Sequence, residues 1–265
     1  MARPSGGRTH SNIKGAPDYD DATYWDTKFA TGQDVGEWLN SGGVVLEAVL
    51  AVLADLKDRH GGSGMEIAPR ALHLGPGISK LGTKLQEAFS NRGWLSNGIV
   101  NVDFSAEAVR LGQEAEKEQH PSRAMQWIQT DLRSWADVAS LTPFAPFDVI
   151  LDKSTSDAIA TAEPQVFPPS PDPVICPTVH EIVEQNGETE LSPVEGLALH
   201  LVPLTRAGAT WAVLSYSMSR FDNLRYIGRY WEVVSRTPVK APTGSVSSSV
   251  HAPEIFHWLY ILRRI

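Results

Sequence analysis

The sequence predicts an α/β protein with a doubly wound, mostly parallel sheet. Short apolar stretches alternate with amphipathic ones between residues 70 and 216, as strands and helices do in such sheets. A glycine-rich turn, ALHLGPGISKLG at 71–82, connects one of these apolar strands to a helix. Two β-rich stretches then close the chain with no helix between them, which predicts an antiparallel hairpin.

The elements follow one another with short loops. An aromatic-rich stretch, 24–39, is expected to be partly helical, and VVLEAVLAVLADL falls within a predicted helix at 43–57. The predicted strands are 70–74, 99–102, 125–129, 147–151, 210–216, 230–237 and 255–263. The remaining predicted helices are 79–91, 105–117 and 193–204.

Length and composition favour one globular domain at 21–265, preceded by a disordered tail at 1–20. Between Glu163 and Pro193 lies a Pro-rich insert, for which a solvated loop and a lid beside the site both remain open. Its composition predicts low intrinsic order.

Charge, cysteine content and hydropathy limit the classes of partner. A net charge of -8 argues against general nucleic-acid binding, which needs clustered Lys and Arg. The single cysteine, Cys176, excludes an intramolecular disulfide and favours a reducing compartment, expected to be the cytoplasm, with the nucleus or mitochondrion open. No membrane association is expected, because Glu47 and Asp55 interrupt the longest apolar stretch.

The glycine turn by itself is compatible with several ligands. A P-loop needs the order Gly-Lys-Ser/Thr, but Thr83 precedes Lys84 here, so a P-loop is excluded. A dinucleotide fingerprint needs a third glycine where Lys80 stands, which weakens that reading.

Three carboxylates favour another ligand. Asp103, Asp131 and Asp152 each follow a predicted strand, so all three are expected at the carboxyl edge of the sheet, where ligands bind. Such a crevice disfavours pyrophosphate and suits S-adenosylmethionine, which carries hydroxyl and amino donors and positive charge but no phosphate. The alternative role for each aspartate is a helix cap.

Four blocks, LHLGPGISKLG, IVNVDFS, WIQTDLRSW and FDVILDKSTSDAI, together with YWDTKF, carry a family resemblance. From about Tyr24 onward the chain resembles class I, seven-strand methyltransferases. More narrowly it is similar to the lysine methyltransferases of elongation factor 1-alpha and their methyltransferase-like 13 relatives. The resemblance implies a Rossmann-like sheet of order 3-2-1-4-5-7-6 with an antiparallel last strand, and S-adenosylmethionine as cofactor.

By position, the resemblance also implies roles for individual residues. Gly75 and Gly77 would approach the methionine part of the cofactor, and Asp103 would accept from the ribose hydroxyls. Asp152 would line the junction of cofactor and acceptor, and Tyr24 could close over the cofactor. The implied cofactor-binding residues are Trp38, Gly75, Pro76, Gly77, Asp103, Phe104, Asp131, Leu132 and Asp152.

The chain departs from the family pattern at two positions. His73 stands where many class I enzymes have an acidic residue, and a neutral buried histidine is expected there. Ser154 stands where the narrower family has glycine, on the acceptor side. The acceptor is therefore the property that the resemblance leaves open.

The expected activity is methyl transfer to a protein lysine amine, with elongation factor 1-alpha as a possible partner. A small-molecule N- or O-methyltransferase and a non-catalytic scaffold with the same fold are the alternatives. Asp152 and Asp157 are the candidate catalytic bases, since an amine must lose its proton before it attacks. His180, His200 and Tyr216 are weaker candidates, and no histidine spacing predicts a metal site.

Overall fold

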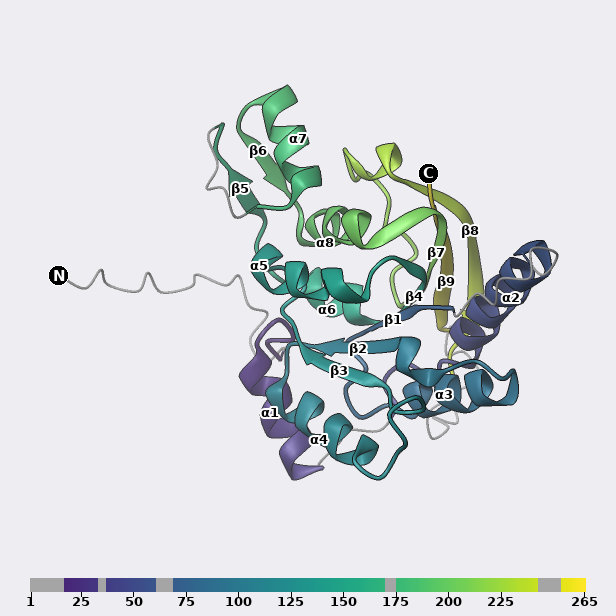
Figure 1. Ribbon diagram of the computed structural model, residues 1–265. Coiled ribbons are helices and arrows are strands. Elements are labelled where there is room, and N and C mark those ends of the chain that lie inside the picture. The colour runs from purple at the N-terminus through teal and green to yellow at the C-terminus, as the bar shows by residue number, and fades with distance from the viewer. Residues whose placement is uncertain (1–16, 33–36, 61–68, 170–174, 243–253) are drawn as a thin grey trace.

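A computed structural model of the chain describes residues 17–32, 37–60, 69–169, 175–242 and 254–265. Its centre is a twisted seven-stranded sheet with helices on both faces (Figure 1). The strands of this sheet are β1 (Ala71–Leu74), β2 (Ile99–Asp103), β3 (Gln126–Gln129), β4 (Phe147–Lys153), β7 (Thr205–Ser215), β8 (Trp231–Lys240) and β9 (Phe256–Arg264). The helices are α1 (Ala22–Thr31), α2 (Gly43–His60), α3 (Leu81–Asn91), α4 (Ala106–Glu116), α5 (Trp135–Val138), α6 (Thr155–Ile159), α7 (Pro177–Asn186) and α8 (Pro193–Leu201).

The strand order is β3-β2-β1-β4-β7-β9-β8. The first five strands in this order pair in parallel, whereas β9 pairs antiparallel with both β7 and β8. Numbered along the chain within this sheet, the order is 3-2-1-4-5-7-6, so the predicted topology and the terminal hairpin are confirmed. The order reverses between β1 and β4, and open α/β sheets bind ligands at such a reversal.

The alternation of side chains along the strands divides the core into two layers. Leu72, Ile150 and Trp211 belong to one apolar cluster, with residues of α8. Their neighbours in sequence, such as Ala71 and Val149, belong to a second cluster that packs against α2 and α3. Because both faces are covered, the central strands are mostly apolar and fully buried, which is the pattern that predicted them.

Several predicted boundaries differ from the structure by a few residues, among them the starts of β7 and α3. Strand β7 begins at Thr205 rather than at 210, because Thr205 already pairs with Phe147 across a register irregularity. Helix α3 begins at Leu81 rather than at 79. The Lys80 amide, which precedes this helix, donates to a carboxylate oxygen of Glu37, 3.0 Å away.

The insert is more ordered than its composition predicted. It contains α7 and a separate two-stranded antiparallel sheet of β5 (Gln165–Phe167) and β6 (Thr189–Leu191). Its buried side chains form an apolar cluster with α8 and the segment before β8, namely Cys176, Val179, Ile182, Val183, Leu191, Leu199 and Tyr226. The expectation of low order was therefore wrong for 175–193, because α7 buries its apolar face against α8.

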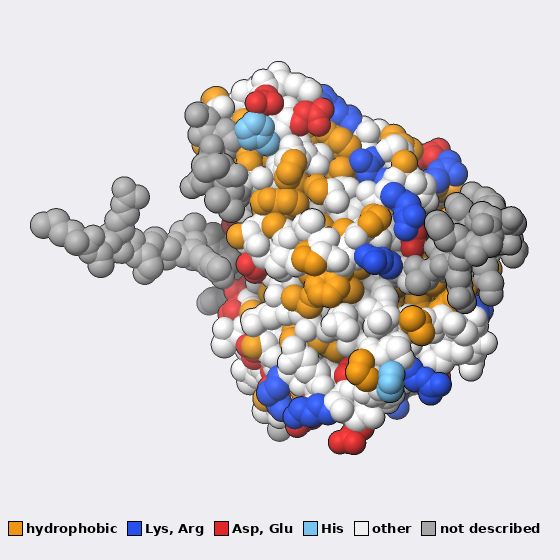
Figure 2. Space-filling model, viewed as in Figure 1, with side chains coloured by type: hydrophobic (Ala, Val, Ile, Leu, Met, Phe, Trp, Pro, Cys, Tyr) orange, Lys and Arg blue, Asp and Glu red, His pale blue; other side chains and the backbone are white. Residues whose placement is uncertain are grey.

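The surface carries mixed charge on the face that Figure 2 draws. Lys and Arg side chains there are interspersed with hydrophobic and acidic ones rather than aligned in one stripe. Within the described ranges, no helix combines the length and apolarity that crossing a membrane requires.

Candidate functional site

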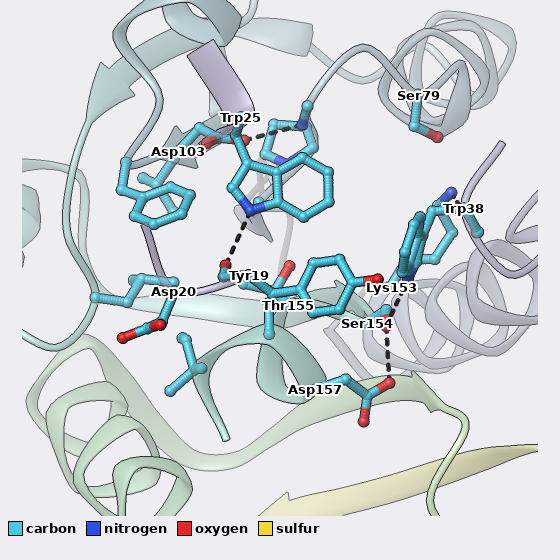
Figure 3. A pocket seen from close by; sticks show the side chains of 18 of the residues that line it. Tyr19, Asp20, Trp25, Trp38, Ser79, Asp103, Lys153, Ser154, Thr155 and Asp157 are labelled. Atoms are coloured by element: carbon cyan, nitrogen blue, oxygen red, sulfur yellow. Dashed lines mark hydrogen bonds between the residues drawn. The ribbon is translucent and has the colours of Figure 1, made fainter. Parts of the chain in front are cut away.

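A cleft of about 370 Å³ lies at the carboxyl edge of the sheet, beside the reversal in strand order. The turn after β1, the ends of β2 and β4, the segment after β3 and the first residue beyond β7 all line it. The N-terminal segment supplies the remaining wall (Figure 3). The cleft thus occupies the position that the sequence predicted for a ligand.

The glycine turn is tight because the protein packs against it. Gly75 and Gly77 both have φ of +51°, a conformation that side chains disfavour. A Cβ on Gly75 would collide with Thr155, and one on Gly77 would lie 2.8 Å from Cζ of Phe29. Both glycines line the cleft together with Pro76. The absence of a Cβ at both positions therefore leaves room for Thr155 and Phe29 as well as for a ligand.

Asp103, at the end of β2, lies in the cleft wall with 5 % of its surface exposed. Its Oδ2 accepts from the Gly77 amide at 2.9 Å, and its Oδ1 accepts from the Ser105 amide at 2.9 Å. The N-cap of α4 is Ser105, so Asp103 is not the cap that the alternative interpretation required. Burial raises the pKa of Asp103 to about 6, although the two amide hydrogen bonds act in the opposite direction.

Asp131 and its neighbours line the cleft beyond β3. Leu132 and Phe104 contribute apolar surface, and Asp131 is paired with Arg133 at 2.8 Å. Burial alone would raise the pKa of Asp131, but hydrogen bonds and charge from Arg133 outweigh it and lower the pKa. Arg133 also contacts Asp20 at 3.2 Å, so it links the cleft wall to the N-terminal segment.

Asp152 does not line the cleft. Its side chain is completely buried, and Oδ1 accepts from the amides of Thr155 and Ser156 at the start of α6. Burial raises its pKa to about 7, with a contribution from the charge of Asp157. The structure thus makes Asp152 a buried acceptor for the first amides of α6, whose N-cap is Ser154, and the prediction of a cofactor-lining base is not supported by its position.

Asp157 lines the cleft, but donors surround its carboxylate. Arg220 lies 2.7 Å from Oδ1, and the Ser215 hydroxyl donates to the same oxygen. The Ser154 hydroxyl, at 2.8 Å, and the Tyr216 amide, at 3.1 Å, donate to Oδ2. A carboxylate that is 2 % exposed and already accepts from four groups is poorly placed to take a proton from an acceptor. These contacts favour a structural role for the Asp157 carboxylate over the predicted role of a base.

Aromatic rings from the N-terminal segment form one wall of the cleft. Trp38 and Tyr24 lie there as predicted, and the sequence interpretation missed Tyr19, Trp25 and Phe29. The rings contact one another, with Tyr19 and Trp38 centroids 5.5 Å apart and Trp25 stacked on Phe29. Tyr19 was assigned to the tail, so the predicted tail of 1–20 extended too far, and residues 1–16 lie outside the described residues. The aromatic run from 19 to 29 was the available signal.

Carboxylates fasten this segment to the sheet edge. Asp26 accepts from the Ser105 hydroxyl and from the Glu107 amide at the start of α4. Glu37 accepts from the Ser79 hydroxyl at 2.8 Å and from Lys153 Nζ at 3.0 Å. These contacts close one side of the cleft with hydrogen bonds to distant parts of the chain.

The cleft contains fewer acidic side chains than we expected from the three aspartates at the strand ends. Asp152 is absent from it, and Lys28, Arg133 and Lys153 contribute positive charge. Arg133 and Lys153 pair with carboxylates. Net charge alone therefore does not select the ligand, and the positions of individual donors and acceptors must do so.

The candidate histidines do not line the cleft. His73 is fully buried, its Nδ1 is 3.0 Å from Asn101 Oδ1, and burial lowers its pKa to about 4, so the predicted neutral histidine is confirmed. His200 is buried against the Leu132 carbonyl, and burial lowers its pKa. His180 lies on α7, which does not reach the cleft. In the part of the chain that the structure describes, no three His, Cys, Asp or Glu residues are grouped to hold a metal.

No family model matches the chain, and no curated protein matches its sequence. Among solved structures, a SAM-dependent methyltransferase from Anabaena variabilis is 12% identical, covers 98% of this chain and 100% of its own, and has a TM-score of 0.49. The magnesium protoporphyrin IX methyltransferase from Synechocystis is 12% identical over 96% of this chain and 100% of its own, with a TM-score of 0.46. The 1,6-didemethyltoxoflavin-N1-methyltransferase from Burkholderia thailandensis is 11% identical over 92% and 86%, with a TM-score of 0.45. Identities of this size transfer no activity, so the chemistry has to come from the cleft itself.

Proposed function

We propose that the chain is an S-adenosylmethionine-dependent methyltransferase. The observation that carries the proposal is the 2.9 Å hydrogen bond from the Gly77 amide to Asp103. In phosphate-binding turns such amides point at phosphate oxygens, whereas here a carboxylate already takes this one. A phosphate at that place would face a negative charge, but vicinal ribose hydroxyls can donate to the remaining lone pairs of Asp103.

The other residues of the cleft suit the same ligand. Leu132 and Phe104 offer apolar surface to an adenine ring, and the Asp131 carboxylate lies next to them. The aromatic wall around Trp38 would exclude water and face the positive sulfur with the π-electrons of its rings. The bound cofactor supplies an electrophilic methyl group, and the residues of the chain hold the two reactants in line.

For the acceptor we propose an amine, carried either by a protein lysine or by a small molecule. Asp152 is completely buried outside the cleft, and the Asp157 carboxylate already accepts hydrogen bonds on both of its oxygens. Lys153 Nζ donates to Glu37 and to the carbonyl of Trp38. The residues of the cleft therefore position the amine, which reaches it as the free base after losing its proton to water.

S-adenosylmethionine and its demethylated product are expected to raise the melting temperature of the protein, while NAD and ATP are not. A ligand that binds only the folded state adds about 2.7 kcal/mol of stability at a hundredfold excess over Kd. Thermal melts with each ligand test this. A shift with NAD or ATP and none with the methyl donor would overturn the cofactor assignment.

Labelled methyl donor and a cell extract separate the acceptor classes. A labelled protein band indicates a protein acceptor such as elongation factor 1-alpha, and a labelled extractable compound indicates a small molecule. Binding of the donor without any transfer indicates the non-catalytic scaffold.

Ile182→Ala in α7 is expected to reduce the free energy of unfolding by about 2–5 kcal/mol, because this side chain is fully buried in the cluster of the insert. No described residue of the insert lines the cleft, so the affinity for S-adenosylhomocysteine should stay within about twofold. Urea denaturation and calorimetric titration measure the two quantities. Loss of affinity without loss of stability would place the insert at the cofactor site.

A further inference from the structure

A chain of hydrogen bonds crosses one side of the cleft mouth and is centred on Ser154. This residue has φ of +69°, where a non-glycine residue is strained. Its hydroxyl accepts from Trp38 Nε1 at 3.2 Å and donates to Asp157 Oδ2 at 2.8 Å (Figure 3). The strained residue is thus the one that connects the N-terminal segment to the turn after β4.

Asp157 continues the chain of hydrogen bonds to the other side of the mouth. Its Oδ2 also accepts from the Tyr216 amide at 3.1 Å, directly after β7. Arg220 pairs with Oδ1 at 2.7 Å, and its guanidinium lies 5.6 Å from the centre of the Tyr216 ring. One buried carboxylate therefore bonds to the Tyr216 backbone and, through Ser154, to the Trp38 ring.

The two aromatic residues are the exposed ends of this chain of hydrogen bonds. Both line the cleft, and Trp38 and Tyr216 are 42% and 53% exposed. The Trp38 ring donates through its indole N–H to Ser154, whereas Tyr216 is held by its backbone amide and lies beside the Arg220 guanidinium. Tyr19 also contacts the Trp38 ring.

We propose that Ser154 and Asp157 are positioning residues that hold Trp38 and Tyr216 as the two sides of the acceptor entrance. The inference rests on the proposed methyl transfer, and it gives a physical reason for a serine at a left-handed position. Glycine there would relieve the backbone but would leave the Trp38 indole without its acceptor. Asp157 acts through both aromatic residues rather than on the acceptor itself.

Ser154→Gly tests the proposal, because glycine suits the backbone at this position and the change removes the short side chain that carries the hydroxyl. We expect unchanged folding and an affinity for S-adenosylhomocysteine within about twofold of wild type. The initial rate of transfer from labelled S-adenosylmethionine into cell extract, at saturating donor, should fall about tenfold, as for one lost hydrogen bond. Ser140→Ala, which removes an exposed hydroxyl outside the cleft, should leave the rate unchanged.

A spectroscopic measurement tests the connection without an acceptor. In a proton–nitrogen correlation spectrum, Ser154→Gly should move both the Trp38 indole signal, assigned by its loss in Trp38→Phe, and the Tyr216 amide signal. The double variant Ser154→Gly/Trp38→Phe should transfer no more slowly than the slower single variant, because both changes remove the same hydrogen bond.

The outcomes separate this proposal from the proposed function. Unmoved signals, or an unchanged rate in Ser154→Gly beside an active wild type, would overturn the positioning role. A wild-type chain that transfers no label would overturn the methyl transfer, and with it the acceptor entrance.

Discussion

Asp103→Ala is expected to weaken binding of S-adenosylmethionine by about tenfold to a hundredfold while the fold survives. Hydrogen bonds to a charged group contribute roughly 1.5–3 kcal/mol, and the variant removes the carboxylate that would accept from the ribose hydroxyls. It also removes the acceptor of the Gly77 amide, which holds the glycine turn against β2. Both losses act on the same ligand, and calorimetric titration measures their sum.

Ser192→Ala is the matched control for Asp103→Ala. Ser192 is the N-cap of α8, its hydroxyl accepts from the Glu195 amide at 3.4 Å, and it lies outside the cleft. The control should lose about 1 kcal/mol of stability with little change in donor affinity. Asp103→Ala with wild-type affinity and a lowered melting temperature would show that Asp103 has only a structural role.

The pH dependence of binding provides a second measurement on the Asp103 variant. The pKa of Asp103 in the folded protein is raised to about 6, so its carboxylate is charged above that pH and protonated below it. Donor affinity in the wild type should therefore be full at pH 7.5 and fall as the pH drops through 6. Asp103→Ala should lack this step, and an identical step in the variant would assign it to another group.

Arg220→Met is expected to reduce the free energy of unfolding by about 3–5 kcal/mol. Removing one member of a buried ion pair leaves the other charge uncompensated. The side chains of Arg220 and Asp157 are 11% and 2% exposed, so the variant would leave the Asp157 carboxylate without its ion-pair partner in a place that water hardly reaches. Denaturation in urea measures the loss.

Arg263→Met is the matched control for Arg220→Met, since its ion pair with Glu232 is about half exposed on both sides. A surface pair contributes about 0–1 kcal/mol. The double variant Arg220→Met/Asp157→Asn should lose less free energy of unfolding than the two single variants together. The reason is that it contains neither charge of the pair, so no buried charge is left without its partner. A loss below 1 kcal/mol in Arg220→Met would show that the hydroxyl and amide donors suffice for Asp157.

Local pattern was enough to predict the strands and the place of the cleft. The apolar runs of β1, β2 and β4 are recognisable because both faces of each strand are covered, so every position needs an apolar or satisfied side chain. The same logic placed Gly75, Gly77 and Asp103 at one edge of the sheet. The insert was misjudged because its prolines dominate its composition, whereas the apolar face of α7 decides its structure.

By itself the sequence determined the fold class and the edge at which a ligand would lie, because those follow from periodicity along short stretches, and it carried the motifs on which the resemblance rests. Only the tertiary structure decided which carboxylates reach the cleft and what each one does. Arg133 meets Asp20 across 113 positions of sequence, and Arg220 meets Asp157 across 63. Asp152 and Asp157 lie close together in sequence, yet Asp152 is completely buried outside the cleft and Asp157 lines it. The partners that distinguish them come from distant parts of the chain, and only folding brings those parts together.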